Sequence, residues 1–268
     1  MQTKVVLITG ASSGIGLELA KQLRDKGIKV YAASRRGIID SEQSGIIPVE
    51  MDVNNKENIQ TVLSDILKEN NRFDAVICNA GNGIAGSIEE TSEEEARYQM
   101  ETNFFGTVKT IRTCLPIFRK QGCGKIMVTS SVAAIVPIPY QAFYSAGKSA
   151  ISIFMQALSM EVKPFGIQCC TVLSGDTKTG FTSARKYTKE SQSSASVYSE
   201  RMRKSVGKME KDELNGMNAS FVAQKMARQI LKKKMKPTLI PGFQYKLIYA
   251  VFPIIPIRLR LWVVRKLY

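Results

Sequence analysis

The stretch VVLITGASSGIG, residues 5–16, decides the fold of this chain. Its apolar run Val5–Ile8 precedes a turn rich in glycine and serine, and Ile15–Lys26 then has apolar residues at helical spacing. A helix that starts at such a turn presents unpaired N–H groups and the positive end of its dipole. We therefore expect a phosphate group to bind here, although a Gly-Ser loop without a ligand has the same composition.

The alternation of apolar runs and helical patterns continues over the first two thirds of the chain. Strands are expected at residues 29–33, 46–51, 75–78, 125–129 and 168–173, and helices at residues 59–68, 93–118 and 144–163, the second of these broken near Pro116. This order predicts βαβ units and a doubly wound, Rossmann-type α/β fold with a parallel sheet. Ligands of such sheets bind beyond the carboxyl ends of the strands, where residues 9–16 are expected to lie.

The last third of the chain has a different character. Residues 177–215 are mostly polar and are expected to form a lid over the substrate. Residues 219–234 return to a helical pattern, and residues 239–268 form an apolar, basic extension that prolines interrupt. Because no linker or internal repeat separates two parts, residues 1–268 are interpreted as a single domain.

Composition excludes several kinds of chemistry. The chain of 268 residues has no histidine, which removes Ser-His-Asp triads, Cys-His pairs and histidine-ligated metal sites, and no bound metal is expected. Its five cysteines have no CxxC spacing and no signal peptide is apparent. We therefore expect reduced thiols and a cytoplasmic protein.

The net charge of +15 is concentrated in the last part of the chain. After Glu213 there are eleven Lys and Arg residues and no Asp or Glu. These basic residues are mixed with aliphatic runs, so a nucleic-acid partner is not expected. The uncharged run Leu247–Ile257 is shorter than the roughly 20 residues that a membrane span needs. The basic and apolar residues after it fit peripheral contact with a membrane, a cap on the substrate cleft, or packing on a partner subunit.

The glycine turn and the second expected strand together predict a nucleotide. Gly10 permits the turn, Gly14 lets a pyrophosphate approach the backbone, and Gly16 lets the helix pack against the strand. The second strand ends in AASRRG, which offers no carboxylate for a ribose 2′-hydroxyl. Arg35 is instead placed to bind the 2′-phosphate of NADP, and Ser13 could add a hydroxyl. The alternative is that the arginines of this segment are only solvated.

Several motifs resemble those of the short-chain dehydrogenase/reductase family over roughly residues 3–180. They are TGxxxGxG at residues 9–16, CNAG at 78–81, Asn103 in NFFG, Ser131 in TSSV and the Tyr-x-x-x-Lys of YSAGK at 144–148. The segments VVLITGASSGIGLELA, CNAGNGIAGSIEE and EVKPFGI are similar to the 17β-hydroxysteroid-dehydrogenase-like branch. The resemblance implies an enzyme that interconverts a ketone and a secondary alcohol with a nicotinamide cofactor, which Arg35 makes NADP(H).

Four residues are expected to be catalytic. A free tyrosine has a pKa of about 10, and Lys148, one helical turn from Tyr144, is expected to lower it. Tyr144 would exchange a proton with the substrate oxygen, and Ser131 would hydrogen-bond that oxygen. The resemblance implies that Lys148 also holds the nicotinamide ribose and that Asn103 anchors a water linking Lys148 to solvent.

The expected cofactor contacts come from several segments, and Asp52 and Val53 resemble the pair that borders the adenine ring. The full set is Gly10, Ser12, Ser13, Gly14, Ile15, Gly16, Arg35, Asp52, Val53, Asn79, Ala80, Gly81, Tyr144, Lys148, Gly175, Thr177 and Thr179. Two positions depart from the family pattern. Ser174 stands where proline is common, which loosens the turn beside the nicotinamide, and Gly147 stands where serine is frequent.

Three functions remain open from the sequence. The first is NADP(H)-dependent chemistry on a lipophilic, steroid-like or lipid substrate, whose binding wall would come from residues 135–143 and the stretch after Thr179. The second is reduction of small or carrier-bound ketones such as 3-oxoacyl chains. The third is a non-catalytic NADP(H)-binding regulator. A homo-oligomer, either a dimer or a tetramer, is also expected.

Overall fold

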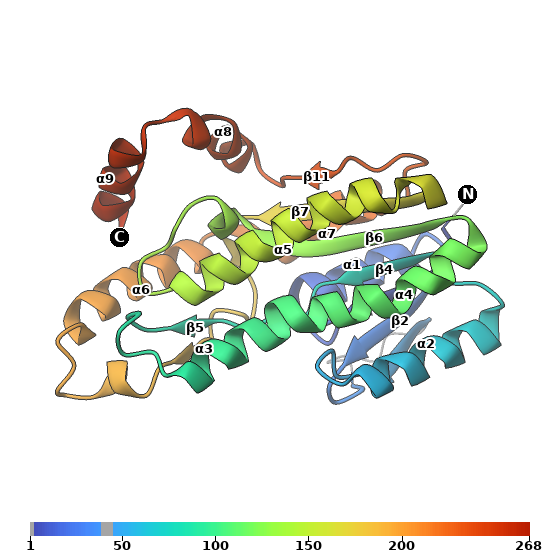
Figure 1. Ribbon diagram of the computed structural model, residues 1–268, viewed down its shortest axis with the longest axis horizontal. Coiled ribbons are helices and arrows are strands. Elements are labelled where there is room, and N and C mark those ends of the chain that lie inside the picture. Colours follow the sequence, from blue (N-terminus) through green and yellow to red (C-terminus); the bar gives the residue numbers. More distant parts are fainter. Residues whose placement is uncertain (1–2, 39–44) are drawn as a thin grey trace.

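A parallel sheet of seven strands forms the centre of the computed structural model, which describes residues 3–38 and 45–268 (Figure 1). Its strand order is β3-β2-β1-β4-β6-β7-β11. The bounds are β1 Val5–Thr9, β2 Lys29–Ser34, β3 Ile46–Glu50, β4 Ala75–Cys78, β6 Gly124–Ser131, β7 Ile167–Ser174 and β11 Thr238–Leu239. All neighbouring strands run parallel, so the predicted doubly wound fold is confirmed.

The strand order reverses between β1 and β4. Thr9, the last residue of β1, lies opposite Ala33 of β2 on one side and Cys78 of β4 on the other. The chain builds outward from β1 to β3 and then returns to place β4 on the other side of β1. The carboxyl ends of β1 and β4 are therefore the position where a sheet of this kind binds its ligand.

Helices cover both faces of the sheet (Figure 1). One face carries α1 (Gly14–Arg24) and α7 (Ala219–Ile230), and the other carries α2 (Lys56–Asn70), α4 (Thr107–Gln121) and α5 (Ala142–Glu161). Along β1, Val6 and Ile8 point to the first layer, whereas Val5 and Leu7 point to the second. Because both faces are buried, the strand is apolar without interruption, and the sequence shows this as a continuous run.

The long helix expected at residues 93–118 is two α-helices joined by a π-helical turn. The turn spans Glu101–Gly106 and lies between α3 (Glu93–Met100) and α4. The break expected near Pro116 is wrong, because α4 continues through this residue to Gln121. Burial of Phe118 and its neighbours against the sheet outweighs the one hydrogen bond that a proline removes.

Residues 177–215 contain more regular structure than their polar composition suggests. The elements of this region and its partners are β5 (Ile84–Ala85), β8 (Thr177–Lys178), β9 (Lys186–Tyr187), α6 (Ser199–Leu214) and β10 (Met217–Asn218). α6 buries Met202, Val206 and Met209, whose spacing is helical but is hidden among many lysines and glutamates. β9 pairs with β5, which ties this region to the loop after β4.

The last part of the chain forms two helices at one end of the molecule (Figure 1). They are α8 (Phe243–Val251) and α9 (Ile257–Leu267), and a short 3-10 helix at Phe252–Ile254 lies between them. Other short 3-10 helices occur earlier in the chain, at Val132–Ala134, Lys163–Phe165 and Glu190–Gln192. Across residues 3–38 and 45–268, no helix combines the length and the hydropathy that crossing a bilayer demands.

The five cysteines, all within the described residues, form no disulfide, and four of them are buried. Burial raises the pKa of Cys78, Cys169 and Cys170 to about 12. These thiols are therefore protonated and unreactive at neutral pH.

Candidate active site

The glycines of residues 9–16 let backbone segments approach closely at the ends of β1 and β4. Gly10 has φ +64°, and a Cβ there would lie 2.7 Å from Ala80 Cα. A Cβ on Gly16 would lie 2.3 Å from the carbonyl oxygen of Gly10. Gly14 has φ +56°, and the position of its missing Cβ is 3.3 Å from Thr179 Cβ. No other residue type fits the conformation and space at Gly10, so this turn requires glycine.

Hydrogen bonds fix the ends of β1, β4 and β6 relative to one another. Thr9 Oγ1 accepts from the N–H groups of Asn79, at 3.0 Å, and Ala80, at 3.1 Å. Asn79 Nδ2 donates to the carbonyl oxygen of Gly10 at 3.0 Å, and Asn79 Oδ1 accepts from Thr129 Oγ1 at 3.1 Å. The predicted residues Asn79 and Ala80 thus brace the glycine turn, and Thr9 and Thr129 are supports that sequence reasoning did not single out.

The N-terminus of α1 offers a place for an anion. Ser13, its N-cap residue, is exposed and makes no side-chain capping bond within the described residues, and no acidic residue stands in the first turn. The neighbouring residues Ser12 and Ile15 are half-buried beside it. An uncapped helix start next to a turn that only glycine can form fits the pyrophosphate of a dinucleotide.

The other residues expected to contact the nucleotide lie beyond the carboxyl ends of neighbouring strands. Arg35 is exposed directly after β2. Asp52 and Val53 follow β3; Asp52 Oδ1 accepts from the Asn54 N–H at 2.9 Å, and Val53 is buried. Because the strands are parallel, these residues share one edge of the sheet with the turn at 9–16.

Ser131 and Tyr144 meet where β6 ends and α5 begins. Their side chains lie close enough to interact, and Ser131 Oγ accepts from the Ala133 N–H at 3.1 Å. Burial raises the pKa of Tyr144 to about 12, and the interaction with Ser131 opposes this rise. The phenol therefore carries its proton at neutral pH, ready to donate it.

Lys148 lies one turn further along α5, beside Tyr144. Its Nζ is 5.6 Å from the centroid of the Tyr144 ring and donates to the carbonyl oxygen of Thr129 at 2.9 Å. Burial lowers the pKa of Lys148 to about 8. Loss of solvent around the phenol therefore sets the direction of the Tyr144 pKa, and the effect expected from the Lys148 charge stays a prediction.

Asn103 lies in the π-helical turn and contacts the loop after β4. Its Oδ1 accepts from the Asn82 N–H at 2.9 Å, and its Nδ2 donates to the Asn82 carbonyl oxygen at 2.9 Å. A Cβ added to Gly81 would lie 3.2 Å from Asn103 Oδ1 and 3.7 Å from Lys148 Nζ. Asn103, Gly81 and Lys148 are therefore neighbours, as the sequence predicts, and the amide of Asn103 holds the loop.

Close packing beside Asn103 explains why a glycine stands at position 147. A Cβ at this position would lie 3.3 Å from the sulfur of Met100 and 3.9 Å from Asn103 Cβ. The small residue lets α5 pack closely against the end of α3 and the π-helical turn. Gly147 thus helps to position Asn103 relative to Lys148.

The turn after β7 is held by the last third of the chain. A Cβ on Gly175 would lie 2.1 Å from ring atoms of Tyr245, which belongs to α8. The Tyr245 hydroxyl donates to Asp176 Oδ2 at 2.9 Å and accepts from the Asp176 N–H at 3.0 Å. Ser174, where proline is common, shares a hydrogen bond of 3.1 Å with Thr177 Oγ1. Side-chain contacts therefore restrain a turn that proline does not.

Residues after Thr179 cover the side of Tyr144 where a substrate would approach. The rings of Phe181 and Tyr144 have centroids 5.8 Å apart. Arg185, buried beneath Phe181, forms ion pairs with Glu210 at 3.3 Å and Glu213 at 2.6 Å. These ion pairs join the segment after Thr179 to α6, so the expected lid region is an ordered, cross-linked unit.

An apolar cluster lies beside this lid region. It consists of Ala85, Met202, Val206 and Met209, with Ile138, Tyr140, Tyr187 and Tyr268 packed against it. Ile138 and Tyr140 come from the apolar stretch 135–143 that the sequence assigned to the substrate wall. The cluster joins four distant parts of the chain in one buried apolar contact.

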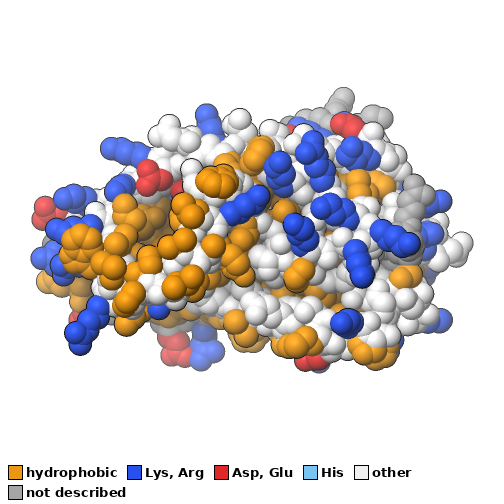
Figure 2. Space-filling model, turned by 90° about the horizontal axis from the view of Figure 1, so that it is seen from above, with side chains coloured by type: hydrophobic (Ala, Val, Ile, Leu, Met, Phe, Trp, Pro, Cys, Tyr) orange, Lys and Arg blue, Asp and Glu red, His pale blue; other side chains and the backbone are white. Residues whose placement is uncertain are grey.

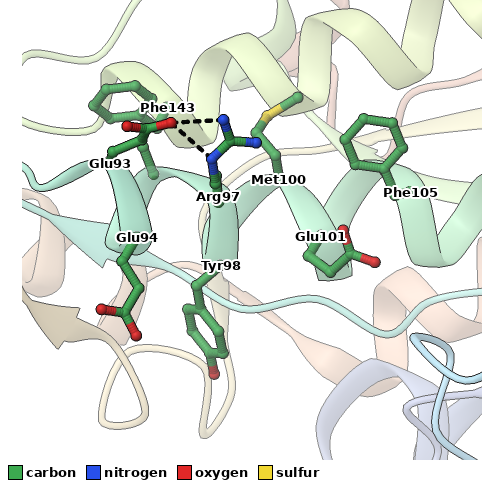
Figure 3. Close-up of a pocket in the computed structure, with 9 residues that line it drawn as sticks. Glu93, Glu94, Arg97, Tyr98, Met100, Glu101, Phe105 and Phe143 are labelled. Atoms are coloured by element: carbon green, nitrogen blue, oxygen red, sulfur yellow. Dashed lines mark hydrogen bonds and ion pairs between the residues drawn. The ribbon is translucent and has the colours of Figure 1, made fainter.

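A cavity of about 620 Å³ lies outside the candidate active site, although Phe143 of the expected substrate wall is part of its lining. It is lined by Glu93, Glu94, Ala96, Arg97, Tyr98, Met100, Glu101, Phe105 and Phe143 (Figure 3). Arg97 pairs with Glu93 at 2.6 Å across its surface. None of the predicted catalytic or cofactor residues lines it.

Sequence reasoning missed Phe181, Arg185 and Tyr245, which surround the predicted site. Arg185 and Phe181 stand in a polar stretch with no helical or strand period, and Tyr245 is distant from every motif. A tyrosine in an extension rich in apolar residues is ordinary, so no sequence signal marks it. Within the described residues, no group of histidine, cysteine or acidic side chains is arranged to hold a metal.

Known dehydrogenases and reductases are similar to this chain in sequence. A family model described as short chain dehydrogenase matches residues 4–190. A 3-ketodihydrosphingosine reductase of Bacteroides thetaiotaomicron is 39% identical over 87% of this chain and 86% of its own length. The human 17-beta-hydroxysteroid dehydrogenase type 1 is 29% identical over 68% of this chain and 59% of its own length.

Solved structures give the same fold. A short-chain dehydrogenase from Streptomyces avermitilis superposes with a TM-score of 0.81 at 26% identity, covering 98% of both chains. Two further enzymes with this fold, both 22% identical, were solved with different nucleotides. The one from Burkholderia phymatum holds NAD (TM-score 0.79, covering 94% of this chain and 92% of that one). The one from Burkholderia cenocepacia holds NADP (TM-score 0.73, covering 94% and 93%).

Proposed function

Since this chain belongs to the short-chain dehydrogenase family, we propose that it is an NADP(H)-dependent reductase of a lipophilic ketone. Members of the family are oxidoreductases that bind a nicotinamide cofactor. The observation that carries the proposal is the meeting of Ser131, Tyr144 and Lys148 at the edge of the sheet that also presents the glycine turn.

The residues for holding the cofactor extend from the turn at 9–16 to the turn after β7. The first turn of α1 would take the pyrophosphate, and Thr179, 3.3 Å from the position of a Cβ on Gly14, would lie over it. Asp52 and Val53 would border the adenine, and Asn79 to Gly81, Gly175 and Thr177 would line the path to the nicotinamide. The bound nicotinamide supplies the hydride.

Proton transfer is assigned to Tyr144. Its raised pKa keeps the phenol protonated, so it can donate to the carbonyl oxygen as that oxygen gains charge. Ser131, beside Tyr144, would turn its single hydroxyl hydrogen to the same oxygen. Lys148, charged below a pKa of about 8, would stabilise the phenolate that remains. Asn103 would place the water through which Tyr144 regains its proton.

Preference for NADP over NAD is assigned to Arg35. The side chain is exposed at the end of β2, and the segment AASRRG at residues 32–37 contains no carboxylate to bind a ribose 2′-hydroxyl. A guanidinium binds a phosphate with two parallel hydrogen bonds.

The substrate is proposed to be a long-chain lipid ketone. The relative that is 39% identical carries the name 3-ketodihydrosphingosine reductase, and it aligns with most of this chain. The half-buried side chains Ile138, Tyr140 and Tyr268, which pack against the buried cluster of the lid region, would offer apolar contacts to an acyl chain.

A substrate panel tests the proposal. NADPH oxidation would be followed with 3-ketodihydrosphingosine, a steroid ketone, a 3-oxoacyl thioester and a short aliphatic ketone. We expect the largest kcat/KM with the long-chain amino ketone. A larger kcat/KM with the 3-oxoacyl thioester or the short ketone would contradict the lipid assignment, and no turnover with any ketone would favour the non-catalytic regulator.

A further inference from the structure

Helices α8 and α9 and the 3-10 turn between them expose many apolar side chains. Nineteen large hydrophobic side chains are exposed among the described residues, and ten of these lie within residues 243–268, which we call the C-terminal platform. Phe243 is 82% exposed and Ile254 is 81% exposed. Figure 2 shows hydrophobic side chains gathered at this end of the molecule, with Lys and Arg side chains around them. A surface of this kind marks a site of interaction.

The apolar residues of α8 lie on its outer side. Phe243 and Leu247 are four residues apart, and Ile254 continues their line beyond the helix. Tyr245 points the other way, onto Gly175 and Asp176. The inner side therefore attaches α8 to the protein, and the exposed stripe is left for another surface.

α9 mixes basic and apolar side chains on its exposed side. Arg258, Trp262 and Lys266 follow one another at intervals of four, so they share one face, and Leu259 and Leu261 are about half exposed beside them. Val264 points inward and is buried. Tryptophan and long basic side chains around leucines are typical of a helix that lies in the interface of a membrane.

Charge distinguishes between the surfaces that could cover the platform. Residues 243–268 include five Lys and Arg residues and no Asp or Glu. In a twofold dimer the same patch from both copies would meet, and five positive charges would face five. An anionic bilayer instead attracts each of them, by about 1 kcal/mol per basic residue near the surface.

We propose that the C-terminal platform docks onto an anionic lipid bilayer. The apolar side chains of α8 and α9 enter the interface, and the basic side chains of α9 contact the lipid phosphates. Docking leaves the protein on the surface of the bilayer, because its buried depth is that of one helix face. The inference stands on the exposed surface and does not depend on which ketone the enzyme reduces.

The platform is attached to both sides of the candidate site. Tyr245 contacts the turn after β7, and Tyr268 packs with Met202, Val206 and Met209 of the lid region. A docked platform therefore places the apolar cluster beside the membrane.

Flotation with vesicles tests the proposal. Vesicles of phosphatidylcholine alone would be compared with vesicles that contain about 30% phosphatidylglycerol, a content at which basic residues near the surface are attracted. The full chain is expected to float with the anionic vesicles and to dissociate as salt rises. The variant R258E/R265E/K266E should lose at least about tenfold in partition coefficient, and Phe243→Ser with Trp262→Ser should lose binding to a similar extent.

A matched variant separates the platform from overall charge. K232E/K233E/K234E removes the same net charge from exposed positions outside the platform and should bind vesicles as the parent chain does. Equal losses in both triple variants would overturn the proposal in favour of unspecific charge attraction. Sedimentation equilibrium tests whether a second copy covers the platform instead. The proposal is overturned if the parent chain does not bind vesicles but forms a dimer that the double variant Phe243→Ser with Trp262→Ser dissociates. Thermal melting of each variant controls for folding.

Discussion

The nucleotide end of the candidate site and its substrate end are formed by different kinds of contact. At the nucleotide end, backbone meets backbone: a Cβ on Gly10 would meet Ala80 Cα, and one on Gly16 would meet the Gly10 carbonyl. At the substrate end, side chains from distant segments meet, as Phe181 does with Tyr144 and Tyr245 with Gly175. The first arrangement tolerates almost no variation in sequence, whereas the second can be rebuilt by exchanging side chains. The cofactor chemistry is therefore fixed by backbone contacts, whereas the choice of substrate can change with the side chains.

The largest expected effect lies where the two ends meet. Tyr144→Phe removes the proton donor and should lower kcat/KM for ketone reduction by about 100- to 10,000-fold. NADPH affinity, measured by fluorescence titration, should change far less than kcat/KM. Tyr98→Phe, in α3 and outside the candidate site, is the matched control and should keep full activity, because the ring that contacts Lys186 remains. Substantial turnover by the Tyr144 variant would show that another group donates the proton.

The next effect belongs to the nucleotide end alone. Arg35→Ala should weaken NADPH binding by about 10- to 100-fold, since a charged hydrogen-bonding partner of the phosphate is lost. NADH binding should hardly change, and Arg36→Ala should have a smaller effect on NADPH. Equal affinities of the parent chain for NADPH and NADH would contradict the assignment of Arg35.

A pair of glycine variants tests whether backbone contact limits the nucleotide end. Gly10 and Gly27 both have positive φ, but a Cβ on Gly27 meets nothing within 4 Å. Alanine should cost about 1 to 2 kcal/mol of unfolding free energy at either position through backbone strain. Gly10→Ala should cost a further 1 to 3 kcal/mol, roughly, through the contact with Ala80. Urea unfolding of both variants measures the difference, and equal losses would contradict the importance of that contact.

The pH dependence of reduction should report Lys148. Its pKa is lowered to about 8, so its charge is present at pH 7 and is lost as pH rises through 8. If this charge stabilises the Tyr144 phenolate, kcat/KM should be about tenfold lower at pH 9 than at pH 7. Tyr144 remains protonated over that range because its pKa is raised. A profile that is flat to pH 9.5 or so would remove Lys148 from proton transfer.

The smallest effect is expected at the substrate end, at the contact between Gly175 and Tyr245. Gly175→Ala places a methyl group against the Tyr245 ring, and Tyr245→Ala creates room for it. The double variant should therefore recover about 1 kcal/mol of unfolding free energy relative to the sum of the single losses. No change at Gly10 offers such a rescue, because its neighbour is backbone. Additive losses at Gly175 and Tyr245 would show that this contact does not limit the turn.

The nucleotide end is easier to predict from the sequence than the substrate end. Its backbone contacts depend on local patterns, whereas the side-chain contacts of the substrate end join distant segments. The glycine turn, CNAG and Tyr-x-x-x-Lys are local patterns whose spacing dictates local geometry, and the structure places Asn79, Asn103, Ser131, Tyr144 and Lys148 together at one edge of the sheet. The parallel sheet follows from the same periodicity. The roles of these residues and the position of Arg35 against a phosphate stay predictions.

Long-range packing limits what could be predicted elsewhere. The buried apolar residues of α6 are Met202, Val206 and Met209, which stand among charged neighbours, so its polar composition hid a helix. Pro116 suggested a break that burial of α4 overrides, and the actual interruption is the π-helical turn around Asn103. The pKa of Tyr144 depends on burial, which no spacing rule reports.

The bonds that Thr9 accepts from Asn79 and Ala80 have a consequence for the order of folding. They join residues 70 and 71 positions apart, and β1 pairs with β4 only after two intervening strands and two helices have been placed. Closing so long a loop carries an entropic cost, and contacts of this separation form late. The turn at residues 9–16 therefore takes its final shape only once β4 has arrived. Pulse-labelling hydrogen exchange should find the amides of Asn79 and Ala80 protected later than those within α2.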